Sequence, residues 1–229
     1  MQQVYERSPD DPEAAIFYAL ALISTAPATD KTFAQQFNAA TILNELAAQM
    51  PNHPGIIHYI IHSYDYPPLA QLALPAARSY AKVAPSVPHA LHMPSHIFTR
   101  LGLWDEAIET DIASATTAKT HVDKTNPGTQ SFDWLHSLDY MVYAYLQTAQ
   151  DGRAKVLVDE VWQRCQGRRR GATSGVRHGS DPCSLRPRKA SVERSRVAKI
   201  ETGRVSLEPL PQCEAITFFA RAVGAARSG

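Results

Sequence analysis

Histidine is the residue type in this sequence whose number and spacing could support chemistry. Five of the nine histidines fall within one short stretch: His58, His62, His89, His92 and His96. Residues four apart share one face of a helix, so His58 pairs with His62 and His92 pairs with His96. Two imidazoles at this spacing can bind zinc. The pattern therefore offers a possible metal or catalytic centre.

Other features of these stretches argue against a metalloenzyme. The string HYIIH lacks the glutamate that acts as the base in H-E-x-x-H metalloproteases. Pro94 predicts that the helix carrying His96 begins after His92, because proline removes a helical hydrogen bond. An ion would also need further ligands, and three acidic residues could supply oxygen: Asp65, Asp105 and Asp139.

A structural role for the histidines is the preferred alternative. Histidine and tyrosine combine an apolar body with a polar tip, which suits hydrogen bonding inside a groove between helices. The expected partners are Tyr59, Tyr64 and Ser95. Recognition of a ligand or peptide in the groove is a second possibility. A metal ion is not expected, and His58 and His62 are the first candidates if one binds.

No other enzyme class has a clear signature. The chain contains no phosphate-binding glycine loop and no dinucleotide fingerprint. Ser95 lacks the flanking glycines of a hydrolase nucleophile elbow. The three cysteines are too scattered for a disulfide framework, and Cys165 is only a minor candidate thiol.

Helical periodicity interrupted by proline or glycine predicts an all-α fold. Asp11 is the expected N-cap of the first helix, and Pro12 suits its first turn. No window alternates with period two, so strands are not expected. Helices are predicted near residues 12–26, 32–50, 55–64, 69–83, 93–101, 103–120, 131–150 and 152–162. Such helices bury their apolar faces only by stacking as antiparallel pairs.

One segment has the pattern of a tetratricopeptide repeat. In FTRLGLWDEAIETDIASA, Gly102 would end the first helix, Trp104 would pack as the aromatic residue, and Ala107 would lie where two helices cross. A weaker copy begins at Tyr145, and its Ala154 stands 47 residues after Ala107. The standard repeat is about 34 residues. The predicted array is therefore an irregular tetratricopeptide-like helix-pair solenoid.

Two longer strings, HPGIIHYIIHSYDYP and PHALHMPSHIFTRLGLW, resemble a family of mostly bacterial tetratricopeptide-repeat proteins. The resemblance covers roughly residues 8–162 and returns at 212–229. It implies a helical-repeat fold and no particular reaction. Members of this family usually carry further helices before the point where this chain starts, so the resemblance implies a truncated N-terminus.

The segment 163–211 differs from the rest of the chain. Residues 163–210 carry a net charge of +8 while the remainder carries −7, and the segment contains no aromatic residue. One interpretation is a disordered basic tail that contacts RNA or an acidic partner. Another is a frameshift, because a shifted reading frame can encode a repeat-like helix here. A third is an ordinary ordered loop. A C-terminal helix is expected at 212–229.

These observations predict three parts, of which residues 8–162 form the repeat domain. The predicted function is a scaffold that binds an unidentified protein or peptide without catalysis and without a cofactor. The expected groove residues are His58, His62, His92, His96 and Arg100. Nucleic acid is an unlikely partner, no membrane span is expected, and a cytoplasmic location is predicted. The alternatives are a metal- or small-molecule-dependent enzyme that uses these histidines, and a non-functional gene product.

Overall fold

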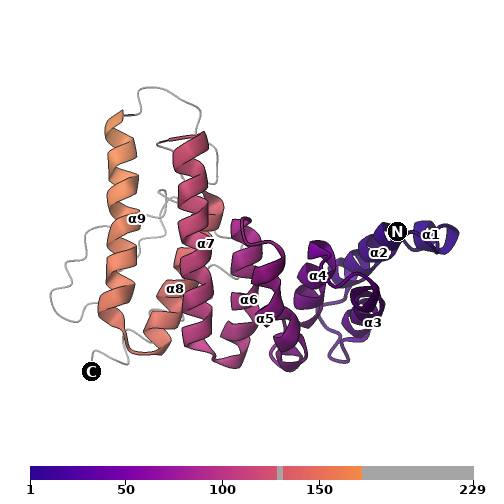
Figure 1. Cartoon of the computed structure of the whole chain (residues 1–229). Coiled ribbons are helices and arrows are strands. Elements are labelled where there is room, and N and C mark those ends of the chain that lie inside the picture. Colours follow the sequence, from indigo (N-terminus) through magenta and orange to yellow (C-terminus); the bar gives the residue numbers. More distant parts are fainter. Residues whose placement is uncertain (128–130, 172–229) are drawn as a thin grey trace. The chain divides into compact units, whose positions relative to one another are not determined.

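The computed structural model describes residues 1–127 and 131–171, and all regular structure in them is helical. The elements are α1 (Gln2–Arg7), α2 (Pro12–Thr25), α3 (Ala34–Gln49), α4 (Pro54–Tyr64), the short 3-10 helix η1 (Ala70–Ala73), α5 (Leu74–Val83), α6 (Pro88–Leu101), α7 (Trp104–Thr125), α8 (Phe132–Gln147) and α9 (Asp151–Gly171), as shown in Figure 1. The predicted all-α class is confirmed. None of these helices is long and apolar enough to cross a bilayer.

Side-chain caps and proline fix where several helices begin. The carboxylate of Asp11 accepts a hydrogen bond from the backbone N–H of Glu13 at 3.0 Å, which confirms the predicted N-cap of α2. His53 caps α4 in the same way, through Nδ1 and the N–H of Ile56 at 3.3 Å. Prolines 12, 54 and 88 occupy first turns, where the missing N–H needs no partner.

Gly102 ends α6 as the sequence predicts. Its φ of 70° lies in the left-handed region. The N–H of Leu103 donates to the carbonyl of Phe98 at 2.9 Å, and the N–H of Gly102 donates to the carbonyl of Thr99 at 3.3 Å. These two bonds form a Schellman motif and satisfy carbonyl groups at the end of the helix.

Several helix boundaries differ from the prediction, among them those of α6 and α9. Helix α6 begins at Pro88 and continues through Pro94, so His92 and His96 lie on one helix. Proline inside a helix costs about 3 kcal/mol, and here it is offset by burial, because most side chains from Ala90 to Phe98 are in the core. Helix α9 runs to Gly171, past the predicted end at residue 162. The rest of the basic segment, and the helix predicted at 212–229, lie outside the described residues.

The even-numbered helices contact one another in chain order, α2 with α4, α4 with α6, and α6 with α8. Helices α3, α5 and α7 each contact the even-numbered helix before and after them. This order makes α4, α6 and α8 neighbours although loops and whole helices separate them in the sequence. Side chains on their facing sides can therefore meet.

Apolar side chains form two clusters in these layers. The first joins α2 to the start of α7, and its fully buried members include Ile16, Leu43, Ile56, Ile61, Met93 and Ile97. The second joins α7, α8 and α9 around Trp134, Leu138 and Met141. Ala107 is buried, and Trp104 is partly buried against Tyr143, with 5.7 Å between ring centroids. Phe37 of α3 lies outside these clusters and is 41% exposed.

We expect Gly102→Ala to destabilise the fold by about 1 kcal/mol, because a side chain makes the left-handed backbone costly. Gly152→Ala is the matched control, since a Cβ at this helical position meets nothing within 4 Å. The control should be neutral or slightly stabilising. Urea unfolding followed by circular dichroism measures both, and equal effects of the two substitutions would contradict the role assigned to Gly102.

Candidate metal centre

Six histidines lie on α4, α6 and α8, the three neighbouring helices. Residues 89, 92 and 96 of α6 share one face, since they are three and four positions apart. The other faces of this helix are occupied by core residues such as Met93 and Ile97. The histidine face of α6 thus lies between His58 and His62 of α4 and His136 of α8.

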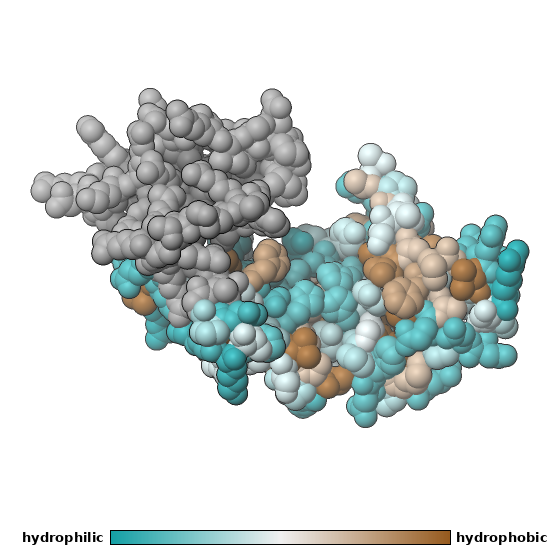
Figure 2. All heavy atoms as spheres, turned by 90° about the horizontal axis from the view of Figure 1, so that it is seen from above, coloured by the Kyte–Doolittle hydropathy of each residue, from teal (hydrophilic) through white to brown (hydrophobic). Residues whose placement is uncertain are grey.

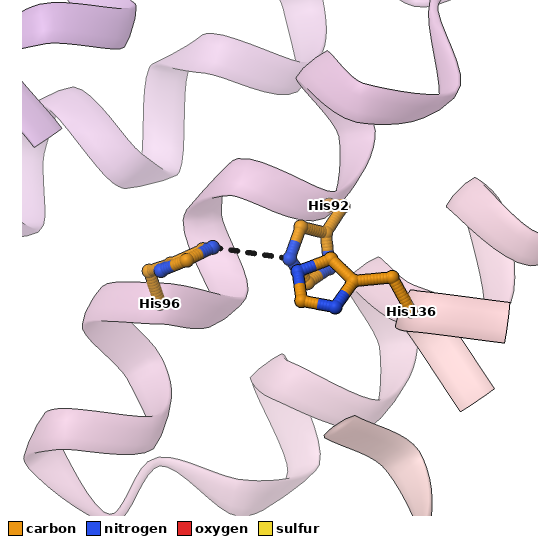
Figure 3. A group of neighbouring side chains, drawn as sticks. All are labelled: His92, His96 and His136. Carbon is orange, nitrogen blue, oxygen red and sulfur yellow. Dashed lines mark hydrogen bonds between the residues drawn. The ribbon is translucent and has the colours of Figure 1, made fainter. Parts of the chain in front are cut away.

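Three of these histidines converge on one point. One nitrogen from each of His92, His96 and His136 lies within 4.8 Å of the others. The Nε2 atoms of His92 and His96 are 3.1 Å apart (Figure 3). The rings of His92 and His136 are 4.4 Å apart between centroids. In a tetrahedral zinc site with bonds of about 2.0–2.1 Å, two ligand nitrogens lie about 3.3 Å apart. The spacing of the two Nε2 atoms is close to this value.

A carboxyl group holds the other nitrogen of His92. Its Nδ1 lies 2.6 Å from Oδ1 of Asp111, a residue of α7. The His92 side chain is 1% exposed and the Asp111 side chain is 0% exposed. The hydroxyl of Ser95 is 3.3 Å from the same Nδ1. This contact fixes the ring so that Nε2 points toward His96.

A second carboxyl group holds His96 in the same manner. Its Nδ1 donates to Oδ2 of Asp65 at 2.9 Å, and the guanidinium Nε of Arg100 donates to Oδ1 of Asp65 at 2.9 Å. The hydroxyl of Tyr140 lies 3.4 Å from Nδ1 of His96, and the Tyr140 ring packs against all three histidines. Both imidazoles are therefore clamped at Nδ1 and turned toward each other at Nε2.

Burial controls the protonation of this network. Burial lowers the pKa of His92 to about 2, helped by the neighbouring imidazoles, and raises the pKa of Asp111 to about 9 against the hydrogen bond from Ser95. Burial also works to raise the pKa of Asp65, but His96 and Arg100 outweigh it and the pKa lies below its ordinary value. Asp111 is thus the protonated acid and Asp65 the carboxylate.

These states define a one-way chain of hydrogen bonds. Asp111 donates to Nδ1 of His92, Nε2 of His92 donates to Nε2 of His96, and Nδ1 of His96 donates to Asp65. A single proton lies between the two Nε2 atoms. The other oxygen of Asp111, Oδ2, is buried without a hydrogen-bond partner among the described residues.

Buried serines place α8 beside this network. The hydroxyl of Ser137 donates to Ser114 of α7 at 2.8 Å, and Ser114 donates to the carbonyl of Pro88 at 2.7 Å. These bonds link the start of α6 to α7 and α8, and Ser137 directly follows His136. These bonds therefore place the His136 ring next to His92. His136 itself forms no hydrogen bond within the described part of the chain, and burial lowers its pKa.

The histidine pair on α4 lies beside the three converging histidines. The His58 and His62 rings are 4.7 Å apart, and the His62 and His96 rings are 5.9 Å apart. Within the described residues, the group with metal-ligand spacing does not include either of them. Tyr80 lies 3.4 Å from Nδ1 of His58, a contact that the sequence did not predict.

The hydrogen-bond partners and oxygen ligands predicted from the sequence agree only in part with the structure. Ser95 contacts His92 as predicted, whereas Tyr59 and Tyr64 make no hydrogen bond to these histidines in the described structure. Asp65 binds Nδ1 of His96 and is not a member of the group of three converging nitrogens. Asp139 is exposed, one turn after His136, and Asp105 is exposed in the first turn of α7.

Sequence reasoning did not select Asp111, His136 or Tyr140 as site residues. Asp111 had a usable signal, since it lies four residues after Ala107 and four before Ala115 on the buried face of α7. A carboxylate on such a face requires a partner. His136 and Tyr140 share a face of α8, but nothing in their spacing indicates which helix they meet.

Comparisons with known proteins do not assign this chain, since no family model, no curated protein and no solved structure matches it. The tetratricopeptide family therefore stays a prediction. The function has to be inferred from the geometry of the described residues.

We expect acid to destabilise the fold through its buried neutral histidines. Burial lowers the pKa of His58 to about 3, while the unfolded chain takes up this proton near pH 6.5, so stability falls as the pH drops below about 6.5. His58→Gln, which keeps a polar group near Tyr80, should reduce the loss between pH 7 and pH 5 by about 2 kcal/mol. Urea unfolding at both pH values tests this, and an unchanged pH dependence would contradict it.

Proposed function

We propose that this protein binds a divalent transition-metal ion, zinc being the best fit, through His92, His96 and His136. The ion would act as a Lewis acid that activates water for a hydrolytic or hydration reaction. One observation carries the proposal. Three imidazole nitrogens lie within 4.8 Å of one another, and two of the rings are clamped by carboxyl groups at their far nitrogens.

The carboxyl groups support the proposal because they match the usual surroundings of metal-bound histidine. A histidine that binds a metal commonly donates its second N–H to a carboxylate, which fixes the tautomer and orients the ring. Asp65 already accepts from His96 in this way. If Nε2 of His92 held an ion, the proton there would be released to solvent, and the proton of Asp111 would move across the 2.6 Å contact to Nδ1. Both supports would stay intact.

The number of ligands favours a catalytic over a structural ion. Structural zinc sites are closed by four protein ligands, whereas catalytic sites use three and leave a position for water or substrate. Three histidines form the group here among the described residues. A metal-bound water has a strongly lowered pKa and provides a nucleophile near neutral pH. The chain's own residues would bind and orient the ion and restrict the access of water.

Protein or peptide binding is the second candidate, and it is the function predicted from the sequence. We propose for it an irregular tetratricopeptide-like stack, supported by the contacts between alternate helices. A specific observation favours it. Phe132 is 76% exposed and stacks on His136 at 5.5 Å, so an apolar contact surface adjoins the histidines. Peptides often bind through such anchors beside polar groups.

We expect the purified protein to bind one zinc or cobalt ion per chain, with binding strongly weakened in His136→Ala. Asp111→Asn should weaken affinity about tenfold, the size of effect common for outer residues that orient ligands. Chelator competition and metal analysis give these values. A visible cobalt spectrum that shifts on adding azide would show that a coordination position is open.

Two substitutions serve as matched controls for metal binding. His121→Ala removes an exposed histidine of α7, and Asp105→Asn removes an exposed acid of the same helix. Both should leave affinity unchanged. The metal centre is ruled out if the wild-type protein binds no ion, or if His136→Ala binds as tightly as the wild type.

The peptide-binding candidate predicts that a captured partner is lost when Phe132→Ala and Arg100→Ala are combined, with helicity retained. The first change removes the exposed ring and the second an exposed cation beside Asp65. Pull-down with metal-free protein separates this function from metal chemistry. Capture that is unaffected by the double substitution would remove this face from consideration.

A further inference from the structure

A row of imidazoles leads from the surface to the three converging histidines. We propose that His89, His58 and His62 form a delivery route, which captures a divalent transition-metal ion at the surface and transfers it to His92, His96 and His136. The inference rests on the proposed metal centre and concerns how the ion arrives there. It assigns a function to three histidines that the centre itself does not use.

A route of this kind matters for the two ligands on α6, which have little exposure, whereas His136 is half-buried. The side chain of His92 is 1% exposed and that of His96 is 15% exposed. A hydrated ion cannot reach these nitrogens without losing its water shell, which is costly when no new ligand replaces the water. Imidazoles placed in succession would replace waters one at a time. A workable metal site requires an entry path for the ion.

The spacing of the rings is suitable for stepwise transfer. The side chain of His89 is 47% exposed. Its ring centroid is 5.2 Å from that of His58, which is 4.7 Å from His62, and His62 is 5.9 Å from His96. A more direct link exists as well, because the rings of His89 and His92 are 6.3 Å apart. An ion bound at about 2 Å from a ring nitrogen lies about 3 Å from the ring centroid, so rings about 6 Å apart can share one ion.

The charge next to His89 fits the outer end of the route. Asp133 lies 3.9 Å from Nδ1 of His89, so a carboxylate accompanies the most exposed imidazole and attracts a cation. Hydrophilic residues cover much of the middle of the face seen in Figure 2, while apolar residues gather toward the end that carries α1 and α2.

The inner rings can present a nitrogen to an ion. Tyr80 lies 3.4 Å from Nδ1 of His58, and in the tautomer whose Nδ1–H donates to the Tyr80 hydroxyl, Nε2 carries the lone pair that would bind a metal. Each transfer forms one metal–nitrogen bond and breaks one bond to water or to the previous imidazole, without redox change. Among the described residues these three histidines do not form a preassembled ligand group, which favours transient binding of the ion over stable binding.

Stopped-flow loading of the full chain with Co²⁺, followed by visible absorption, tests the route. We expect His89→Ala combined with His58→Gln to slow loading several-fold, with the equilibrium affinity unchanged. Release to a chelator must then slow by the same factor, because a route speeds both directions equally. His121→Ala is the matched control and should load at the wild-type rate.

The possible outcomes separate the route from the centre. An unchanged loading rate overturns the route while leaving the centre intact. A fall in affinity that matches the fall in rate also overturns it, because the two histidines would then hold the ion at equilibrium. Absence of cobalt binding by the wild-type protein overturns both. If His58→Gln fails to fold, His89→Ala alone decides the question, since its side chain is largely at the surface.

Discussion

The Nε2 atoms of His92 and His96 lie 3.1 Å apart because a carboxyl group binds each ring at its other nitrogen. This constraint organises the rest of the site. Buried polar groups must find hydrogen-bond partners, and leaving one unpaired costs about 1–3 kcal/mol. Asp111 comes from α7 and Asp65 follows α4. The rings of α6 are therefore oriented only when all three helices are packed together, so the site is a product of tertiary structure.

Helix α6 has to serve the core and the site at once. Its apolar side chains fill the larger cluster, while His92 and His96 face the polar network. The same burial that offsets the cost of Pro94 also removes water from the histidines and lowers the pKa of His92, which keeps that ring neutral. Small residues on α7, such as Ala107 and Ser114, permit the close approach that brings Asp111 to its partner. A substitution on α6 that changes the packing of the core will therefore also change the pKa values of the histidines.

The fold was largely predictable, because local signals decide where helices begin and end. Asp11, Pro12 and Gly102 act through backbone groups within a few residues, and each has the predicted role. The site was predictable only in part. The i, i+4 rule correctly placed His92 and His96 on one face. The helix-breaking cost of Pro94 predicted a later start for α6, because that cost is local and does not include the burial of the helix in the core. Which helix lies opposite is a tertiary property.

The strongest distinction between a structural network and a metal centre is the position of His136. Asp111, His92, His96 and Asp65 already form a chain of hydrogen bonds without His136, although Oδ2 of Asp111 has no partner among the described residues. His136 forms no hydrogen bond within the described residues, yet it is half-buried beside His92 at a cost in desolvation. Stability alone would favour an apolar side chain at this position. Among the described residues no hydrogen-bond donor reaches this ring, so an electron-pair acceptor such as the proposed metal ion would supply the missing partner, and imidazole is a preferred ligand of such ions.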